Sequence, residues 1–502
     1  MKPQVLIVGA GPTGLVLALC LAKQGVPFRL IDKHTGPGEA SRAIAVHART
    51  LELYRQLGLA DEVVAGGIPV DSVQWRTGKE KKVRLPLGEL GKGLSPYPFV
   101  LSYPQDDHER LLVDHLHRQG LTVEWGTELV SFRQDPERVE TVLRKDGIEE
   151  PHTFGYVCGC DGAHSLVRKG LELSFAGGTY RQVFYVADVE ADGMGEGALN
   201  VYLDDSGFCI FLPVRSTGMV RLIGIVPEEA DPSTVTFDII RPYVHKQTGL
   251  TVRRVNWFST YQVHHRVSEH FGKDRVFLAG DAGHIHSPAG GQGMNTGIGD
   301  AVNLAWKLAA VLQGKAQPSL LETYEAERLP FARTLVATTD RAFQLIVGRK
   351  AFNRFMRLFF LPTLAPLLLR LPFLRRMAFQ TVSQTRIHYR ESGLNRGTAG
   401  RIQGGDRLPW VRTPGGDNYE PLQQCNWQLH VYGEAAPEIR DFARSASFPL
   451  FSFDWTPAAG AAGIPRDALF LVRPDGYVGL ALDAPRVEDL RSYVDRYSIA
   501  PL

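Results

Sequence analysis

The sequence predicts an α/β protein in which a parallel sheet is interrupted by an antiparallel sheet and followed by a smaller mixed unit. Three observations support this class. An apolar run that leads through a glycine turn into a helical pattern occurs near 5–22, and this order returns at 156–168 and 276–306. Short alternating runs fill 180–261. Strands and helices resume after a glycine-rich stretch at 393–405, and the length of 502 residues agrees with two or three domains.

Composition and charge are those of an ordinary globular protein. The chain is 44% hydrophobic and 22% charged, with a formal net charge of +2, which gives no electrostatic reason to expect nucleic acid as a partner. Its five cysteines are scattered, so we expect neither a disulfide framework nor a metal site, and a reducing, cytoplasmic location fits best. The apolar run after Lys2 resembles the start of a signal peptide, but the glycines within it favour a buried strand.

The N-terminal segment carries the most specific pattern. An apolar run without alternation leads directly into Gly9, Gly11 and Gly14, and after a helical pattern a second strand at 28–31 ends at Asp32. Glycines for a tight turn, a helix N-terminus for a pyrophosphate and an acid for a ribose form the dinucleotide fingerprint of a Rossmann-type domain. The fingerprint alone does not distinguish NAD from FAD.

A second glycine loop lies within 276–306. An apolar strand breaks at Gly280 and Asp281, several further glycines follow, and a helical pattern begins at about Met294. This order directs backbone N–H groups and the positive end of a helix towards a negative ligand. Because Asp281 suits a ribose or ribityl hydroxyl better than a phosphate, the loop predicts a long ligand such as a reduced flavin. Glycines that only permit tight packing are the alternative.

A third strand end has the same character. The apolar strand at 156–160 ends at Asp161 and Gly162, and a helix with Ser165 and Arg168 follows. The carboxyl ends of the strands of an open α/β sheet converge on one crevice. We therefore expect the three turns to bind one extended ligand.

Two polar side chains lie just ahead of helical patterns. Arg42 precedes a helix that begins near His47, where a guanidinium can reach a phosphate or a flavin edge, and a surface ion pair is the alternative. Gln105 comes before a helix whose first turn is rich in acids. Its amide suits a flavin ring contact or a simple helix cap.

The alternating runs predict an antiparallel substrate-binding sheet at 176–261, inserted between 1–175 and 262–345 of the nucleotide-binding domain. The sheet is rich in aromatic residues, which either line a pocket for a flat substrate or form a core. The pocket candidates are Tyr202, Phe211, Trp257 and Tyr261.

Residues 346–395 predict a helical connector. Its basic, apolar part at 349–376 is too short and too interrupted by proline to span a bilayer. We expect it to cover the substrate opening or contact another subunit rather than a membrane surface. Residues 396–502 predict a compact αβ unit, which has no CxxC pair and is therefore not expected to do redox work.

With these motifs, the sequence resembles the FAD-dependent aromatic hydroxylases, the p-hydroxybenzoate hydroxylase-like flavoprotein monooxygenases, up to about Arg328. The resemblance rests on the first glycine motif with Asp32, on CDGAHSLVR at 160–168, and on the segment from Gly280 through Asn295. Gly283 departs from the alanine that is usual there. The segment LVRPDG at 471–476 is similar to the thioredoxin-like C-terminal domain of the phenol and polyketide hydroxylase branch.

The resemblance implies an FAD site in which Gly9, Gly11 and Gly14 hold the pyrophosphate and Asp32 the adenosine ribose. The full set of implied cofactor-binding residues is Gly9, Gly11, Pro12, Thr13, Gly14, Asp32, Lys33, Arg42, Gln105, Asp161, Gly162, Asp281, Pro288, Gly291, Gly293, Met294 and Asn295. Pro288, on the substrate side of the flavin, and His47 are the candidate catalytic residues. A base for the substrate is conceivable at His47, Tyr202 or Tyr261, and nothing in the sequence selects one.

The resemblance also implies an activity that depends on NADPH or NADH and on O2. A hydride would reduce FAD, and a flavin C4a-hydroperoxide would hydroxylate an aromatic, phenolic or polyketide-like substrate. No separate donor domain is visible, so the donor would bind transiently to a monomer or homodimer. The alternatives are a Baeyer–Villiger or epoxidising monooxygenase on the same scaffold, a flavin-binding protein without catalysis, and a nicotinamide-dependent dehydrogenase, which would be colourless. The WxWxIP segment of flavin halogenases is absent.

Overall fold

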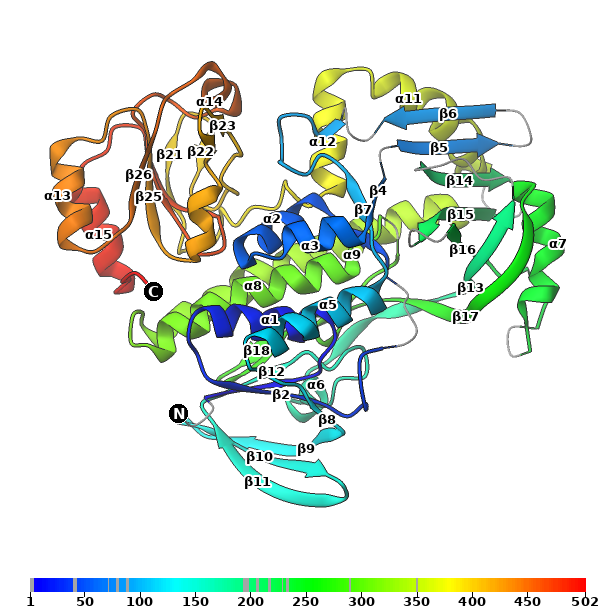
Figure 1. Ribbon diagram of the computed structural model, residues 1–502, viewed down its shortest axis with the longest axis horizontal. Coiled ribbons are helices and arrows are strands. Elements are labelled where there is room, and N and C mark those ends of the chain that lie inside the picture. The colour runs from blue at the N-terminus through cyan, green and yellow to red at the C-terminus, as the bar shows by residue number, and fades with distance from the viewer. Residues whose placement is uncertain are drawn as a thin grey trace.

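The computed structural model describes residues 4–38, 43–70, 72–77, 81–86, 90–192, 198–204, 207–214, 218–227, 229–231, 234–288, 290–348 and 351–502. A central body of helices and a parallel sheet carries a large antiparallel sheet on one side and the C-terminal unit on the other (Figure 1).

The central sheet has the order β18-β19-β12-β1-β2-β8, and only β18 runs antiparallel to its neighbour. Its strands are β1 (Val5–Val8), β2 (Phe28–Asp32), β8 (Glu124–Trp125), β12 (Tyr156–Gly159), β18 (Gly272–Lys273) and β19 (Val276–Leu278). The middle strands β1 and β12 are buried along their whole length. Both faces of the sheet are covered, which explains why these strands show no alternation in the sequence.

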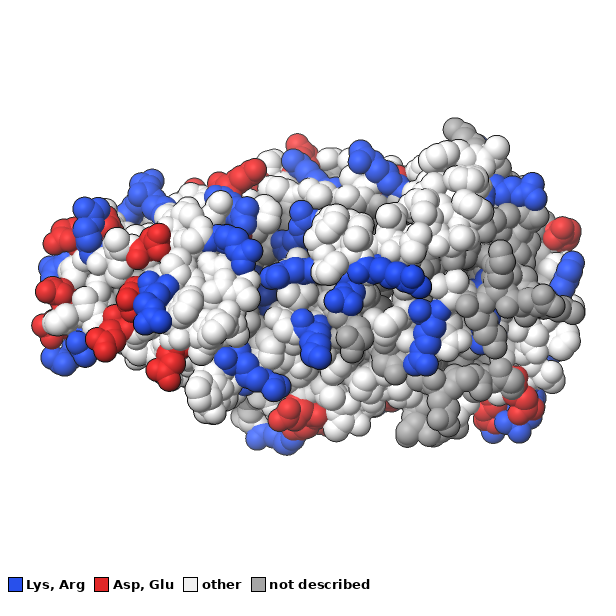
Figure 2. All heavy atoms as spheres, turned by 90° about the horizontal axis from the view of Figure 1, so that it is seen from above, with Lys and Arg blue, Asp and Glu red and all other residues white. Residues whose placement is uncertain are grey.

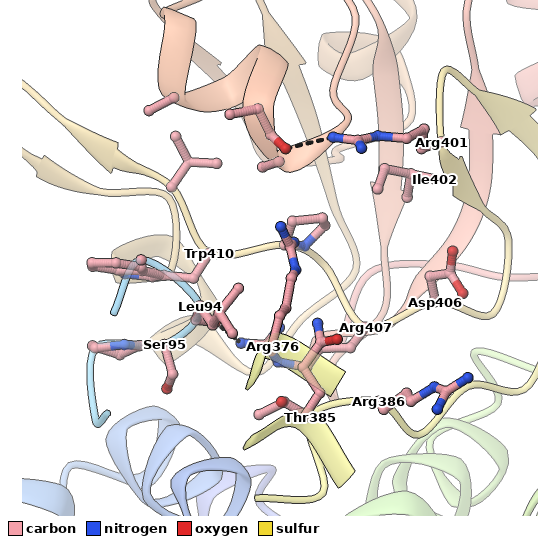
Figure 3. A pocket seen from close by; sticks show the side chains of 18 of the residues that line it. Leu94, Ser95, Arg376, Thr385, Arg386, Arg401, Ile402, Asp406, Arg407 and Trp410 are labelled. Atoms are coloured by element: carbon pink, nitrogen blue, oxygen red, sulfur yellow. Dashed lines mark hydrogen bonds between the residues drawn. The ribbon is translucent and has the colours of Figure 1, made fainter. Parts of the chain in front are cut away.

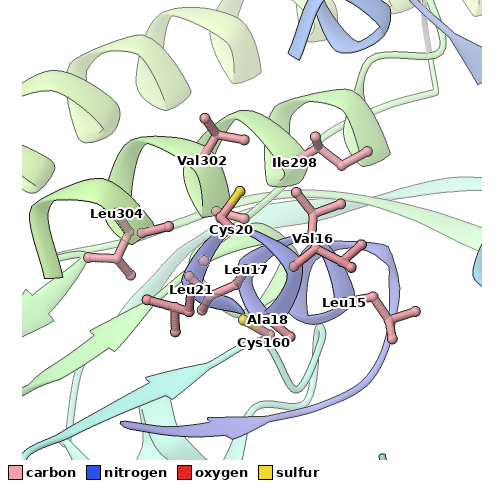
Figure 4. Close-up of a cluster of buried hydrophobic side chains, with 14 of the residues drawn as sticks. Leu15, Val16, Leu17, Ala18, Cys20, Leu21, Cys160, Ile298, Val302 and Leu304 are labelled. Atoms are coloured by element: carbon pink, nitrogen blue, oxygen red, sulfur yellow. The ribbon is translucent and has the colours of Figure 1, made fainter. Parts of the chain in front are cut away.

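The two faces are covered by different layers. Helices α1 (Pro12–Lys23), α5 (Gln105–Arg118) and α8 (Gly293–Leu312) pack on one face, where Leu17, Val16 and Ile298 belong to one buried cluster (Figure 4). The other face carries α6 (Leu166–Gly170) and the sheet β11-β10-β9. The bounds of that sheet are β9 (Thr127–Gln134), β10 (Val139–Lys145) and β11 (Ile148–Phe154).

The antiparallel sheet is larger than the expected 176–261, because strands from outside that range join it. Its order is β20-β17-β13-β16-β15-β14-β5-β6. The strands are β5 (Ser72–Thr77), β6 (Lys81–Pro86), β13 (Phe175–Asp192), β14 (Ala198–Asp204), β15 (Gly207–Val214), β16 (Met219–Ile225), β17 (Thr251–Ser268) and β20 (His284–Ile285). Helix α7 (Phe237–Thr248), which the sequence reading did not anticipate, covers one face, and α9 (Glu322–Val347) packs on the other.

Short elements join these layers. A small sheet, β3-β7-β4, and two helices follow β2: β3 (Ala45–Val46), α2 (Ala48–Leu57), α3 (Ala60–Gly66), β4 (Ile68–Val70) and β7 (Val100–Ser102). The connector consists of α10 (Ala351–Phe355), the π-helical η3 (Met356–Leu364), α11 (Ala365–Leu368) and α12 (Pro372–Val382). Its η3 contacts β5 and β14 at the far edge of the antiparallel sheet. Within the described ranges, no helix combines the length and apolar character needed to cross a bilayer.

The C-terminal unit is a six-stranded mixed sheet of order β22-β21-β28-β27-β25-β26, flanked by helices. Its strands and helices are β21 (Arg396–Ala399), β22 (Ile402–Gln403), β25 (Gln428–Tyr432), α13 (Pro437–Ser445), β26 (Leu450–Phe453), α14 (Pro457–Ala462), β27 (Leu469–Val472), β28 (Val478–Leu482) and α15 (Val487–Tyr497). Trp306 and Ala310 of α8 belong to its buried cluster, so this core continues into the central body.

Candidate functional site

The three glycine turns lie side by side at one edge of the central sheet. Strand β12 is the parallel neighbour of β1 on one side and of β19 on the other. Gly9, Asp161 and Gly280 follow directly or closely after these strands, so parallel pairing brings them to the same edge. The structure thus brings together the turns that the sequence separates by more than a hundred residues.

The turn after β1 leaves no room for a side chain at two of its glycines. A Cβ on Gly14 would lie 1.9 Å from the Gly9 carbonyl oxygen, and one on Gly9, whose φ is +103°, would lie 2.4 Å from the Cys160 oxygen. Gly11 is different, because a Cβ there would meet nothing within 4 Å. Open space therefore begins at the N-terminus of α1, which has no side-chain cap and no acid in its first turn. Its N–H groups and its positive end are available to an anion.

A crevice of about 1120 Å³ extends from this turn, with Gly11, Asp32, Lys33, Asp161 and Gly162 among its lining residues. Asp32 is fixed by the Ala10 N–H at 2.8 Å and the His34 N–H at 2.9 Å. Asp161 accepts the N–H groups of Leu166 and Val167 on one oxygen, at the start of α6. Its buried Oδ1 has no hydrogen-bond partner among the described residues. An unused acceptor beside an open crevice suits a ligand hydroxyl.

Thr13 lies where α1, the turn after β19 and α8 meet. A Cβ on Gly280 or on Gly297 would lie 2.5 or 2.4 Å from its Oγ1. These glycines therefore permit the N-termini of α1 and α8 to approach each other. The N-terminus of α8 at Gly293 also has no side-chain cap and no acid in its first turn. Asp281 and Pro288 are exposed on the loop that leads to it.

Both polar atoms of the Asn295 side chain are hydrogen-bonded to other groups of the protein. Its Oδ1 accepts from the His47 N–H at 2.8 Å and the Thr50 hydroxyl at 2.7 Å, and its Nδ2 donates to the carbonyls of Ala45 and Gly291. The side chain therefore joins β3 and α2 to the glycine loop. It holds the loop in place, and the backbone of Gly293 and Met294 forms the N-terminus of α8.

His47 is buried and supports the same loop. Its Nε2 lies 2.8 Å from the Gly290 carbonyl oxygen, which can only accept, so Nε2 carries the proton. Burial lowers the pKa of His47 to about 4 and the backbone carbonyls oppose this effect only in part. The imidazole is therefore neutral at ordinary pH.

One polar cluster near the loop was missed by the sequence reading. The buried Asp300 accepts from the Gly280 N–H at 3.0 Å, from His284 Nε2 at 2.7 Å and from Arg328 Nε at 2.6 Å. Arg328 also donates to the Thr296 carbonyl and the Tyr389 hydroxyl. Burial alone would raise the pKa of Asp300, but the Arg328 guanidinium and the hydrogen bonds from His284 and the Gly280 N–H outweigh burial and hold the pKa below its usual value. Two residues beyond Ile298, Asp300 falls on the opposite side of α8 from it, so no local pattern in the sequence indicated this cluster.

Of the two polar candidates that precede helical patterns, Gln105 lies within the described residues and Arg42 does not. Gln105 is the first residue of α5, its side-chain Nε2 donates to Glu109 Oε1 at 2.8 Å, and its N–H donates to the Ala43 carbonyl. Arg42 lies outside the described residues.

The four aromatic pocket candidates fall on opposite faces of the antiparallel sheet. Tyr202 and Phe211 stack at 5.6 Å inside the cluster covered by α7. Trp257 pairs across the strands with Asp188, and the Arg221 guanidinium lies 5.7 Å from its ring centre. Arg221 itself reaches the Ala43 carbonyl at 3.5 Å, so this face looks towards the central body.

Tyr261 shares that face. It pairs with Phe184, which packs with Phe343 of α9. Only Trp257 and Tyr261 therefore lie on the side of the glycine loop. A bidentate ion pair between Arg221 and Asp188, with both distances 2.7 Å, is a further polar feature of this face that sequence reasoning missed.

Comparison with known proteins agrees with this geometry. Residues 2–339 match the family model described as FAD binding domain. A 6-methylpretetramide 4-monooxygenase of Streptomyces rimosus is 34% identical over 95% of this chain and 90% of its own length. A flavin-dependent monooxygenase of Mycobacteroides abscessus is 33% identical over 96% and 98%. A pentachlorophenol 4-monooxygenase of Sphingobium chlorophenolicum is 33% identical over 68% of this chain and 65% of its own length.

Solved structures are similar over the whole chain. An aklavinone-11 hydroxylase, solved as a ternary complex with FAD and aklavinone, has a TM-score of 0.81 at 25% identity, with 99% of both chains covered. The OxyS anhydrotetracycline hydroxylase from Streptomyces rimosus has a TM-score of 0.78 at 27% identity, with the same coverage.

Proposed function

Because the chain belongs to the FAD-dependent aromatic hydroxylase family, we propose that it hydroxylates a fused, polyketide-like phenolic ring with O2 and with NADPH or NADH as electron donor. The observation that carries this is the convergence of three strand ends on the uncapped N-termini of α1 and α8. The relative that acts on 6-methylpretetramide matches 95% of the chain, whereas the pentachlorophenol enzyme matches 68%. Similarity that includes the C-terminal unit favours the polyketide-like class over simple phenols.

The residues of the first turn fit the adenosine half of FAD. Gly11 leaves open space at the N-terminus of α1 for the pyrophosphate, and Asp32 lies in the same crevice for the ribose. Lys33, Asp161 and Gly162 line the remainder of the crevice. When bound, FAD supplies the oxidising chemistry that no side chain can provide.

The second loop fits the flavin half. The positive end of α8, with Gly291, Gly293 and Met294, would stabilise a delocalised negative charge on the pyrimidine edge of the flavin. Pro288 would border the substrate, and Trp257 and Tyr261 would form the opposite wall.

We assign His47 a positioning role. Its proton is donated to the Gly290 carbonyl, and its low pKa makes it a poor base for a phenol at neutral pH. Together with Asn295 it fixes the glycine loop, so it acts on the reaction through Gly290 and Gly291.

The division into parts is also proposed. Residues 1–175 and 262–345 form the FAD-binding domain, 176–261 the substrate sheet and 346–395 the connector. Residues 396–502 form a thioredoxin-like domain. Parallel pairing of β25 with β26, and antiparallel pairing of β27 with β25 and with β28, support that fold. Cys425 is buried and alone in this unit, so its role is structural.

A direct test is to purify the protein and follow its colour and its donor oxidation. We expect a yellow protein that releases FAD on denaturation, and an oxidation of NADPH or NADH that fused polyketide phenols stimulate. The product should carry one added hydroxyl oxygen by mass and NMR. A colourless protein, or a flavoprotein whose donor oxidation no phenol, naphthoquinone or polyketide stimulates, would contradict the proposal. A lactone product would instead indicate the Baeyer–Villiger reaction.

Asp281→Ala should lose flavin, because this exposed carboxylate follows the strand end at the ribityl–phosphate region. The measurement is the ratio of flavin to protein absorbance after gel filtration. Asp441→Ala, an exposed acid of α13, is the matched control and should keep wild-type occupancy. Full flavin occupancy in Asp281→Ala would show that the Asp281 carboxylate is not needed for flavin binding.

A further inference from the structure

A second cleft, of about 1020 Å³, lies away from the glycine loops. Its walls are the loop at 92–98, α12 with the residues that follow it, and the C-terminal unit from Arg401 to Asp417 together with α14. Arg376, Arg386, Arg401 and Arg407 come from different segments around one space (Figure 3). The cleft therefore exists only because the C-terminal unit docks against the central body.

The cleft is strongly basic. Figure 2 shows Lys and Arg side chains running across the middle of this face of the molecule, with Asp and Glu gathered mainly towards its ends. The cations that line the cleft are Lys92, Arg376, Arg386, Arg390, Arg401, Arg407 and Arg412, against the acids Asp406 and Asp417.

The acids within reach are already engaged. Asp406 binds Arg390 with two hydrogen bonds of 2.7 and 2.9 Å, and Asp417 pairs with Arg55 from outside the cleft. Glu52 lies behind the cleft and takes two hydrogen bonds from Arg407, of 2.8 and 2.6 Å. These pairs hold the walls in place and engage the carboxylates of Asp406, Asp417 and Glu52 with other cations.

Arg376, Arg386 and Arg412 have no carboxylate partner in the described part of the chain, and Arg401 donates to the Ala461 carbonyl. Partial burial lowers the pKa of Arg376, and the positive charges of Arg401 and Arg407 lower it further. The charges of Arg401 and Arg407 thus disfavour the protonated form of Arg376, and an anion among these groups would relieve the repulsion. Trp410 adds an indole N–H on the same wall that is buried without an acceptor among the described residues.

We propose that this cleft binds a small molecule that carries a pyrophosphate group. Guanidinium groups bind phosphate oxygens through charge-assisted, often paired hydrogen bonds, and here they approach from facing walls. The volume matches that of ligand sites in general. This site is separate from the flavin site and does not depend on the hydroxylation proposed above.

The test uses the FAD-loaded enzyme and inorganic pyrophosphate, measured by isothermal titration calorimetry. We expect saturable binding that weakens with added salt, because the contacts are ionic. Arg376→Gln and Arg401→Gln should each weaken it by about tenfold, the loss of one charge-assisted hydrogen bond. Arg440→Gln, an exposed position of α13 on the far side of the C-terminal unit, is the matched control and should bind as the wild type does.

The same titrations distinguish the sources of the pyrophosphate. If NADPH or NADH displaces inorganic pyrophosphate, and Arg376→Gln raises the KM of the donor at unchanged kcat, the ligand is the electron donor. If pyrophosphate binds and neither dinucleotide displaces it, another phosphate ester occupies the cleft. No saturable binding at about 1 mM pyrophosphate, or binding that neither arginine substitution weakens, would overturn the proposal. Flavin content and donor oxidation report separately on the hydroxylase function.

Discussion

At the scale of single residues, the glycine loop is held by buried polar side chains rather than by apolar packing. His47 holds Gly290, Asn295 holds Gly291, and Asp300 holds Gly280. His47 lies between β3 and α2, Asn295 lies in the first turn of α8, and Asp300 lies further along the same helix. The loop therefore has a rigid frame before any ligand binds, which reduces the ordering that binding requires.

This frame makes stability depend on pH in a defined window. Burial lowers the pKa of His47 and of His286 from 6.5 to about 4. Between these values the unfolded chain binds protons that the folded protein does not, so the contribution of these two histidines to the free energy of unfolding rises with pH there and is level above 6.5. On acidification, each histidine should cost about 1.4 kcal/mol per pH unit below the unfolded pKa.

His47→Gln should remove one of these contributions. Gln can still donate to the Gly290 carbonyl but does not titrate, so the variant should lose about 2 kcal/mol less stability than the wild type between about pH 7.5 and about pH 5. Urea unfolding at the two pH values measures this difference. His117→Gln, at an exposed position of α5, controls for removal of an imidazole from the surface. An unchanged pH dependence in His47→Gln would show that His47 is not held neutral.

At the scale of elements, the contact between α1 and α8 decides whether the two halves of the site meet. Thr13 occupies the space that Gly280 and Gly297 leave empty. The helices pack through small residues at this end and through Val16, Cys20 and Val302 further along (Figure 4).

Gly297→Ala should separate these helices. The new methyl group would lie 2.4 Å from Thr13 Oγ1, and such overpacking costs about 1–3 kcal/mol. We expect lower thermal stability and weaker FAD binding, measured by differential scanning fluorimetry and by fluorescence titration of the apoprotein. Adding Thr13→Ala removes the clashing oxygen and should restore much of both. If the double variant is no better than Gly297→Ala alone, the two residues are not in contact as described.

Local patterns in the sequence predicted the strand–glycine–helix units, because close packing and helix N-termini demand particular residues within a short stretch. The convergence of Gly9, Asp161 and Gly280 followed from the rule for parallel sheets. Helix α7 escaped notice because Pro242 lies inside it and interrupts the helical pattern. The positions of Tyr202 and Phe211 depend on which face α7 covers, so alternation along a strand cannot assign them to core or pocket.

At the scale of the whole molecule, charged residues join the C-terminal unit to the central body. Arg473 donates to Glu327 at 2.7 and 2.9 Å and to Asp475 at 2.6 Å, and Lys307 donates to Glu327 at 2.8 Å. All four side chains are almost wholly buried. Such contacts join residues far apart in the chain and leave no periodic trace in the sequence.

Glu327→Gln should loosen this interface, because it removes the anion between two buried cations, at a cost of about 3–5 kcal/mol. Trp306 and Trp427 lie 5.6 Å apart at the interface, so their emission should shift to longer wavelength as water enters. Early cleavage by trypsin in the connector should accompany the shift. Glu438→Gln, on the exposed side of α13, should change neither signal. Wild-type emission in Glu327→Gln would mean that the pair contributes little to docking.

Helix α8 begins at the glycine loop and ends inside the C-terminal core, where Trp306 and Ala310 lie beside Trp427 and Leu429. A polypeptide truncated after α9 would therefore expose the indole of Trp306 and neighbouring apolar side chains of α8 to water. Such a fragment would be expected to aggregate. Deleting the C-terminal unit, or replacing it with that of a relative, would therefore require redesign of the α8 surface in the same step.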